Sequence, residues 1–484
     1  MADNSHSGTP DRREDGSSLP EGWCQSTIGE LAEVNPKKID ADLGSKAGFV
    51  PMALAPVNFL DSLEHEEKTW GEIKKSYTNF QDNDVIFAKV TPCFENGKAA
   101  IVRNLPNAIG AGSSEFYVLR AHKSLVSEKL IFAVVKTFDF LQQGAENMTG
   151  AVGLRRVPRA FVEAFPVPLP PLAEQKVIAE KLDTLLAQVD TTKARLERIP
   201  DIIKRFRQSV LSAAVSGKLT EGWVVDRLIL SDVADFQNGY AFKSGWFESE
   251  GEYQVIKLGN IRDGYLAIEN SPAYLKPDVA KDYIRFSPEP GDTLISMTGT
   301  RFKKDYGFGC LVRDEKKILI NQRVGRLTPK KSFIMDEYLN LFVRSDRFRD
   351  QFFKGETGGV NQGNVGSNHI MSISVELPGI EKQTEIVRRV EELFAYADTI
   401  EQKAAAALER VNNLTQSILA KAFRGELTAD WRAANPALIS GDNSAEALLA
   451  KIQAEREKLA LEKKAAKKPR KKKTDAATAT KQTR

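Results

Sequence analysis

The chain has 484 residues, which is the length of about three domains. Hydrophobic residues make up 42% and charged residues 28%, the usual composition of a folded protein. This balance excludes general disorder, and the lack of an apolar run of about 18 residues excludes a membrane-spanning helix. The net charge of +4 is unevenly placed, because residues 463–484 hold ten basic residues and one acid, leaving −5 on residues 1–462. The polar residues 1–18 predict a disordered N-terminus, and we expect a cytoplasmic protein.

The motifs of several enzyme classes are missing from the sequence. Its three cysteines and four histidines are scattered, which predicts neither a disulfide framework nor a metal site. We find no phosphate-binding GxxxxGK[ST] loop, no GxGxxG after a strand, no GxSxG elbow and no Asn/Asp-Pro-Pro-aromatic tetrapeptide of amino-methyltransferases. These absences favour a binding protein without catalytic residues and without a bound cofactor.

The first globular segment is predicted to be a mixed α/β domain. Short β-branched runs at 84–90 and 116–119 predict strands, and 128–142 predicts a helix. Polar and basic residues follow the first strand, and a glycine-rich tract at 149–156 carries two arginines. The candidate DNA-contacting residues are Lys89, Thr91, Asn96, Lys98, Arg155 and Arg156.

An internal repeat follows this domain. Residues 169–223 align without a gap on residues 377–431, with 16 identities in 55 positions. Each copy has apolar residues at alternating spacings of three and four, from Ile178 to Val210 and from Ile386 to Ile418, which predicts two coiled-coil helices. About 43 residues correspond to a rod of about 64 Å.

The ends of both helices are also predicted. Each begins after prolines and closes at a glycine, Gly217 or Gly425. Pro200 interrupts the first copy, so we expect a kink or a restart there. Bulky seam residues in one copy match small ones in the other, which would let the two helices approach closely. The 3.5-residue period and the matched lengths favour an antiparallel pair over two separately buried amphipathic helices.

The second globular segment repeats the pattern of the first. Strands are predicted at 253–258 and 292–297, and a helix at 336–353. Lysine and arginine bind phosphates, and asparagine and glutamine read adenine, although solvated surface is the commoner use of any one lysine. The candidates here are Thr300, Arg301, Lys303 and Lys304 after the second strand, and Asn361, Gln362 and Asn364 in a glycine-rich tract that could also be a plain connector.

The C-terminal region predicts one more helix. Leu448, Leu449, Ile452 and Leu459 recur at helical spacing in 444–464, either as a brace for a partner or as a solvated helix. Residues 463–473 are strongly basic and form either a DNA-binding arm or a solubilising end.

The order of these parts resembles the specificity subunit of type I restriction-modification systems. The resemblance covers residues 19–431 and rests on LPPLAEQ at 169–175, its weaker copy LPGIEKQ at 377–383, and the helix ends at 217–223 and 425–431. The tracts KVTPCFENGK at 89–98 and NQRVGRL at 321–327 are similar to tracts of that family.

The resemblance implies an α+β fold with two target-recognition domains, each followed by a long helix, and the two helices forming an antiparallel coiled coil. The expected boundaries are 1–18 for the disordered N-terminus, 19–168 for domain 1, 169–219 for the central helix, 220–376 for domain 2, 377–428 for the second helix, and 429–484 for the C-terminal helix and basic tail.

It also implies a function. Each domain would read half of a bipartite site in double-stranded DNA, with the helix pair setting the gap. Two methyltransferase subunits would use S-adenosylmethionine to methylate adenine, and two restriction subunits would use ATP and Mg²⁺. A coiled-coil scaffold with two protein-binding domains is the alternative.

Overall fold

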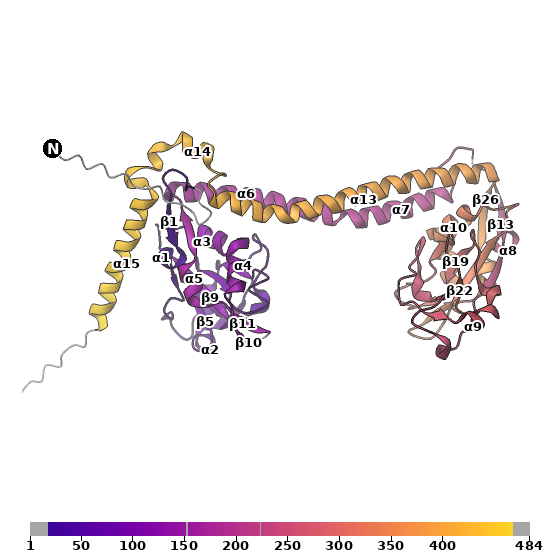
Figure 1. Ribbon diagram of the computed structural model, residues 1–484, viewed down its shortest axis with the longest axis horizontal. Helices are drawn as coiled ribbons and strands as arrows, with labels where there is room; N and C mark the ends of the chain where they lie inside the picture. Colours follow the sequence, from indigo (N-terminus) through magenta and orange to yellow (C-terminus); the bar gives the residue numbers. More distant parts are fainter. Residues whose placement is uncertain (1–17, 152, 223, 468–484) are drawn as a thin grey trace, which may run out of the picture. The chain divides into compact units, whose positions relative to one another are not determined.

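The computed structural model describes residues 18–151, 153–222 and 224–467. The chain divides into two compact units: the first consists of Met1–Ala194 and Leu408–Arg484, and the second of Arg195–Ala407. Helix α13 (Ile380–Phe423) therefore contributes its first part to the second unit and its last part to the first, as the colours in Figure 1 allow the reader to follow.

The first unit contains a domain with two four-stranded sheets, of orders β2-β9-β6-β7 and β4-β3-β8-β5. Only β3 and β8 pair in parallel within them. A β1-β12 pair and a β10-β11 hairpin complete the strands. The elements are β1 (Cys24–Thr27), α1 (Ile28–Leu31), β2 (Ala32–Val34), β3 (Lys46–Val50), β4 (Glu66–Thr69), α2 (Trp70–Ile73), β5 (Thr78–Gln81), β6 (Val85–Ala88), β7 (Ala99–Ile101), β8 (Ile109–Gly112), β9 (Phe116–Ala121), α3 (Glu128–Val135), α4 (Phe138–Glu146), β10 (Thr149–Ala151), β11 (Leu154–Arg156), α5 (Arg159–Ala164), β12 (Pro166–Leu169) and α6 (Leu172–Glu197).

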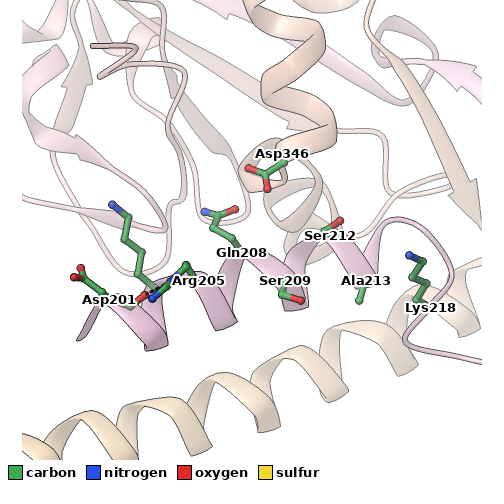
Figure 2. A pocket seen from close by; sticks show the side chains of 9 residues that line it. Asp201, Arg205, Gln208, Ser209, Ser212, Ala213, Lys218 and Asp346 are labelled. Atoms are coloured by element: carbon green, nitrogen blue, oxygen red, sulfur yellow. Dashed lines mark hydrogen bonds between the residues drawn. The ribbon is translucent and has the colours of Figure 1, made fainter. Parts of the chain in front are cut away.

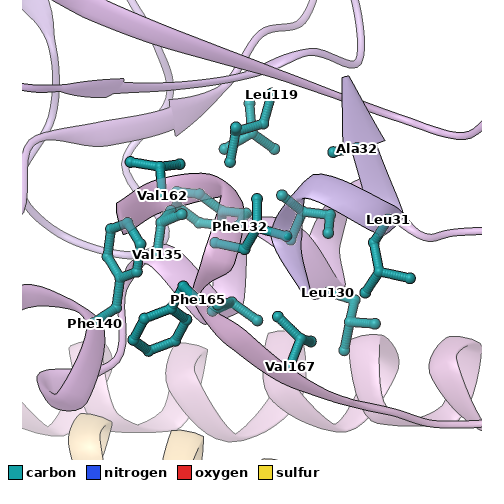
Figure 3. Packing of buried hydrophobic residues seen from close by; sticks show 14 of the residues in the cluster. Leu31, Ala32, Leu119, Leu130, Phe132, Val135, Phe140, Val162, Phe165 and Val167 are labelled. Carbon is teal, nitrogen blue, oxygen red and sulfur yellow. The ribbon is translucent and has the colours of Figure 1, made fainter. Parts of the chain in front are cut away.

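The main core of this unit lies between the first sheet and helices α3, α4 and α5. Figure 3 shows Leu119 of β9, Leu130 of α3, Phe140 of α4 and Val162 of α5 directed into it. Every one of these side chains is at most 3% exposed. This core holds the strand and loop that carry the candidate residues of the first unit.

Two α-helices follow α13 in the described part of the chain, the short α14 (Ala429–Ala434) and the longer α15 (Ala445–Lys467). Ala445, Leu448 and Ile452 are buried in the same core, whereas Leu459 and Leu461 are exposed. The predicted C-terminal helix is therefore neither free of the body nor solvated throughout, because its first turns complete the core of the first unit. The predicted basic tail begins at residue 463: residues 463–467 are the end of α15, and residues 468–484 lie outside the described residues.

The second unit repeats the first sheet as β14-β23-β19-β21 and has a three-stranded sheet β18-β15-β22. The pairs β13-β26 and β16-β17 and the small sheet β20-β25-β24 complete the strands. The elements are α7 (Ile199–Ala214), β13 (Val225–Ile229), α8 (Leu230–Val233), β14 (Ala234–Asn238), β15 (Tyr253–Ile256), β16 (Ile261–Arg262), β17 (Tyr265–Leu266), β18 (Tyr274–Leu275), α9 (Pro277–Lys281), β19 (Thr293–Ser296), β20 (Thr298–Gly299), β21 (Gly309–Leu311), β22 (Ile318–Ile320), β23 (Val324–Pro329), α10 (Asp336–Arg344), α11 (Asp346–Phe352), β24 (Glu356–Gly358), β25 (Gly363–Val365), α12 (Ser367–Met371) and β26 (Ser374–Pro378).

The predicted helical stretches at 128–142 and 336–353 are each two helices, which corrects the sequence interpretation. The break falls at a hydroxyl residue that caps the second helix of each pair. Thr137 accepts the backbone N–H of Phe140, and Ser345 accepts that of Phe348. The caps begin a new helix because the hydroxyl satisfies a backbone donor that a continuous helix would bond internally.

The long helices pair antiparallel in both units. In the first unit, Ile178, Leu182 and Leu186 of α6 pack with Leu419 and Ala422 of α13. In the second unit, α7 packs against the first part of α13, and its Arg207 pairs with Glu401 at 3.0 Å. The two-part organisation, with a long helix after each domain, confirms the predicted fold class.

The predicted seam needs one correction. The predicted spacing passes through Leu185 and Thr192, but Leu185 is only partly buried and Thr192 is exposed, while Leu186 is buried. Leu186 is buried because α6 packs against Trp23 and Ala133 of the globular domain as well as against α13, so its buried face is wider than a coiled-coil seam.

Pro200 restarts the first rod, as expected. Helix α6 ends at Glu197, α7 begins at Ile199, and the proline lies in the first turn of α7, where its missing N–H costs no hydrogen bond. Gly217 and Gly425 follow the ends of α7 and α13 with φ values of 77° and 74°. This left-handed conformation terminates a helix and favours glycine.

The repeated LPxxxxQ motif has a structural role. The buried side chain of Gln175 accepts the N–H of Ser127, just before α3, and donates to the carbonyl of Pro170. The equivalent bonds of Gln383 join Met335, just before α10, and Pro378, each at 2.8 Å. In both units the glutamine thus fixes the start of a long helix against its own domain.

Candidate nucleic-acid interface

In the first unit, the β10-β11 hairpin lies along the loop that follows β6. Val90 forms a β-bridge with Arg156, and the backbone N–H of Thr91 donates to the carbonyl of Arg155 at 3.0 Å. Thr91 also accepts the N–H of Arg155 on its hydroxyl. Two candidate groups that are about 60 residues apart in the sequence are therefore one surface.

The two arginines of this surface are held by carboxylates. Arg156 donates two hydrogen bonds to Glu115, at 2.7 and 2.9 Å, and Arg155 pairs with Glu95 at 3.1 Å. The bond from Arg156 holds the pKa of Glu115 below its ordinary value. Both arginines are about 40% exposed (43% and 42%), so their remaining N–H donors face solvent.

The other candidates of the first unit differ in role. Lys89 donates to the carbonyl of Ser114 at 2.8 Å beside the hairpin, and Lys98 donates to that of Met52 at 2.8 Å. Asn96 is exposed and lines a groove of about 250 Å³ with residues of α6 and α13. The structure therefore gathers Lys89, Thr91, Arg155 and Arg156 on one surface, while Asn96 faces a groove beside the helices and the ammonium of Lys98 is tied to the domain's own backbone.

The second unit brings its two candidate groups together in the same way. In the sheet β20-β25-β24, Thr298 pairs with Asn364, which also pairs with Thr357. The Thr300–Lys304 loop follows β20 directly, and Arg301 reaches across to Glu356 of β24 at 3.3 Å. Lys303, Lys304, Asn361, Gln362 and Asn364 are all exposed.

The two surfaces are built in the same register. Val90 pairs with Arg156 in the first unit, and Thr298 pairs with Asn364 in the second. Each residue of the second pair lies 208 positions after its equivalent in the first pair, which is the offset of the helical repeat. The backbone bond from Val157 to Lys89 has its equivalent from Val365 to Met297, again 208 positions on. The domains are thus equivalent at this surface although their sequences diverge.

Two exposed residues of the second surface were missed by the sequence analysis as candidates. The carbonyl of Arg323 accepts the backbone N–H of Met297, directly before β20. Arg323 and Gln322 beside it are both exposed. Arg323 stands where the first unit has Glu115, which could have been found by extending the 208-residue offset through the domains.

A separate groove of about 740 Å³ lies along α7 in the second unit (Figure 2). Its lining carries three cations, Lys204, Arg205 and Lys218, which Asp201 and Asp346 partly offset. None of the candidate residues lies in it. Within the described ranges, no helix has the length and apolar character needed to cross a bilayer, and no three potential metal ligands are grouped.

Comparison with known proteins decides the family. The family model described as type I restriction modification DNA specificity domain matches residues 20–201 and 221–410. The chain belongs to this family. It is 38% identical to the type I restriction enzyme EcoKI specificity subunit of Escherichia coli, over 90% of this chain and 96% of the relative. It is 41% identical to the EcoBI specificity subunit of Escherichia coli, over 64% of this chain and 68% of the relative.

Solved structures agree on the fold. The HsdS subunit from Thermoanaerobacter tengcongensis matches with a TM-score of 0.59 at 19% identity, covering 85% of this chain and 99% of that chain. A chain from a structural study of type I R-M complex assembly and conformational transition matches at 0.62 and 19%, covering 85% and 100%. The chain is a DNA sequence-specificity subunit of a restriction-modification system, which favours the predicted function over a protein-binding scaffold.

Proposed function

We propose that each unit of this specificity subunit reads one half of a bipartite site in double-stranded DNA. The supporting observation is that the two surfaces have the same strand pairing. The Val90–Arg156 pair of the first unit and the Thr298–Asn364 pair of the second are related by the same 208-residue offset. The reading domains are proposed at 19–168 and 220–376, the helices at 169–219 and 377–428. The residues proposed to build the DNA-binding surfaces are Lys89, Thr91, Asn96, Lys98, Arg155 and Arg156 in one domain and Thr300, Arg301, Lys303, Lys304, Asn361, Gln362 and Asn364 in the other.

The residue types on these surfaces suit duplex DNA. Half-exposed arginines and exposed lysines bind phosphates or guanine edges, and the exposed amides of Asn361, Gln362 and Asn364 match adenine. Lys98, whose ammonium is already bonded to Met52, acts in this proposal by holding the loop rather than by reaching a base.

The antiparallel helices are proposed to set the gap between the half-sites. Two readers held by a stiff spacer select a site by separation as well as by sequence, because half-site spacing is a geometric quantity. The body outside the basic tail is slightly acidic, so partner subunits are proposed to supply part of the grip on phosphates.

Catalysis is proposed to reside in partner subunits. Two copies of an adenine methyltransferase would bring S-adenosylmethionine, and two restriction subunits would bring ATP and Mg²⁺, in the cytoplasm. This chain would supply no catalytic residue and bind no cofactor of its own.

Methylome sequencing tests the proposal. A host that carries this chain and its methyltransferase partner should show methylated adenine in both halves of one split motif, and a host with the partner alone should not. A methylation pattern that does not depend on this chain, or a motif without a gap, would contradict the proposal.

A further inference from the structure

Phe302 is the most exposed phenylalanine of the second unit, with 79% of its surface open to solvent. It lies in the loop after β20, with Arg301 on one side and Lys303 and Lys304 on the other. A single exposed apolar residue is common in proteins. The first unit shows why this one is not an ordinary surface residue.

Counted from the preceding strand, the equivalent residue of the first unit is Phe94, since both follow their strands at the 208-residue offset. Phe94 is 1% exposed and packs on Phe87 and Phe140, with ring centroids 6.3 and 5.8 Å apart. Its ring lies over Gly144, where an added Cβ would come within 2.3 Å of it. The glycine therefore provides the space for the Phe94 ring.

In the second unit that space is filled. Position 352, which is equivalent to Gly144, is a fully buried phenylalanine whose ring packs on Phe348 at 5.7 Å and on Tyr306 at 5.8 Å. The loop is also two residues longer, because Phe87 pairs with Ala99 whereas Ile295 pairs with Gly309. Tyr306 anchors this loop in the core, and Phe302 is left outside.

Hydrogen bonds from Arg349 and to Asp305 hold the loop that carries Phe302. The guanidinium of Arg349 donates to the carbonyls of Lys304, Tyr306 and Gly307, at 3.0, 2.9 and 2.9 Å. The backbone N–H of Thr300 donates to the carboxylate of Asp305 at 2.7 Å. A loop held at both ends loses little conformational freedom when a ligand covers it.

The surroundings of the ring indicate duplex DNA as the ligand. Three cations flank it, and Arg301 links its loop to the sheet that carries Asn361 and Gln362. The apolar group that a duplex presents to such a surface is the C5-methyl of thymine in the major groove. We propose that Phe302 packs against a thymine methyl in the half-site read by the second unit, a contact without a counterpart in the first.

This inference rests on the proposed function, which supplies the half-site. Because adenine is the proposed methylated base, each half-site contains at least one A·T pair and hence one thymine. Deoxyuridine pairs like thymidine but lacks the methyl group, so it removes the proposed contact alone.

The test uses the complex of the full chain with its methyltransferase partner and duplexes of the methylome-defined site. Each thymidine in both half-sites is replaced by deoxyuridine in turn, and affinity is measured for wild type, Phe302→Ala, Phe302→Leu and Phe333→Ala. Phe333 is also an exposed phenylalanine of the second unit, so Phe333→Ala controls for the loss of an exposed ring elsewhere in the unit. Its carbonyl accepts a hydrogen bond from Gln383 at the start of α13, which places it away from the proposed contact.

We expect one deoxyuridine, in one half-site only, to weaken wild-type binding about fourfold, the factor for one buried methyl group. Phe302→Ala should weaken binding to the thymidine duplex and lose this sensitivity, whereas Phe302→Leu and Phe333→Ala should keep it. If Phe302→Ala binds like wild type, or weakens binding while keeping every deoxyuridine effect, the inference is wrong. A wild-type complex without preference for a bipartite site would instead refute the proposed function.

Discussion

The carboxylate of Glu174 is fully buried where three segments of the first unit meet. It accepts a hydrogen bond from the indole of Trp23 at 2.8 Å and from the hydroxyl of Thr428 at 2.6 Å, and it pairs with Arg432. The carboxylate of Glu174 thus joins the segment before β1, the start of α6 and the residues after α13. A buried ion pair changes the free energy of folding little when both partners are present, but the loss of one partner strongly destabilises the fold.

Glu174→Ala is therefore expected to lower the free energy of unfolding by about 3–5 kcal/mol, because the Arg432 side chain, only 13% exposed, loses its carboxylate partner. Urea denaturation followed by circular dichroism measures this. Lys382→Ala changes the equivalent residue of the second unit, which pairs with Glu385 near the surface, and should cost under about 0.5 kcal/mol. If the Glu174→Met/Arg432→Met double variant is no more stable than Glu174→Ala, the unpaired charge is not the cause.

Lys136 is a second residue whose charge is buried. The residue is 6% exposed and its ammonium donates to the carbonyls of Val57 and Gly97. Burial lowers the pKa of Lys136 to about 8. The unfolded chain therefore binds more protons than the folded one between about pH 8 and 10.5, so this residue adds stability as the pH rises through that window.

Relative to Lys136→Met, the wild-type free energy of unfolding should rise from pH 7 to pH 10 by up to about 3 kcal/mol. The comparison with the variant removes the contributions of other lysines and tyrosines. Urea denaturation at a series of pH values measures the difference. A difference that is constant across the series would show that Lys136 keeps an ordinary pKa.

Among the elements, the basic loop of the second unit carries the clearest electrostatic prediction. Lys303 is exposed and flanks the small sheet, so its proposed partner is a phosphate. Lys303→Ala should weaken binding to cognate and unrelated DNA alike and reduce the slope of log K against log salt by about 0.9.

Titrations at several salt concentrations test this in the complex with the methyltransferase. Asn361→Ala is the matched variant, since its neutral amide should change sequence preference and leave the salt slope unaltered. An unchanged slope for Lys303→Ala would exclude its phosphate contact.

Helix α15 divides into a structural and an exposed part. Ile452→Ala removes a fully buried side chain from the core of the first unit and should cost about 2–5 kcal/mol. Leu461→Ala changes an aliphatic residue of the same helix that is 66% exposed, and its effect should stay within about 0.5 kcal/mol. Thermal unfolding measures both, and equal effects would contradict this division.

For the whole molecule, helix length is the quantity to vary. Removing residues 187–193 from α6 and 408–414 from α13 takes one heptad from each helix and keeps both apolar faces in phase. The helices shorten by about 10 Å, so the gap in the target site should shrink by up to about three base pairs while both half-sites stay the same. Methylome sequencing of a host with the shortened chain reads the new gap, and altered half-sites would refute the spacer role.

How far the sequence predicts the candidate site differs between its residues. The groups Lys89–Thr91 and Arg155–Arg156 were both proposed, but their pairing through Val90 depends on a sheet that joins distant strands. That Lys98 is bonded to Met52 while Lys303 is exposed could not be predicted, because the partner lies 46 residues away in the sequence. The break of each predicted domain helix at Thr137 and Ser345 was signalled locally and was overlooked.

The sequence by itself determined the long helices, the restart at Pro200, the terminating glycines and the order of domain and helix, because periodicity, proline and glycine act over a few residues. Only the tertiary structure decided which candidates share a surface. It also decided that Phe94 is buried in the core of the first unit, whereas the equivalent Phe302 is exposed in the second. Those outcomes depend on volumes and hydrogen bonds supplied by residues far along the chain, such as Phe352 in the place of Gly144.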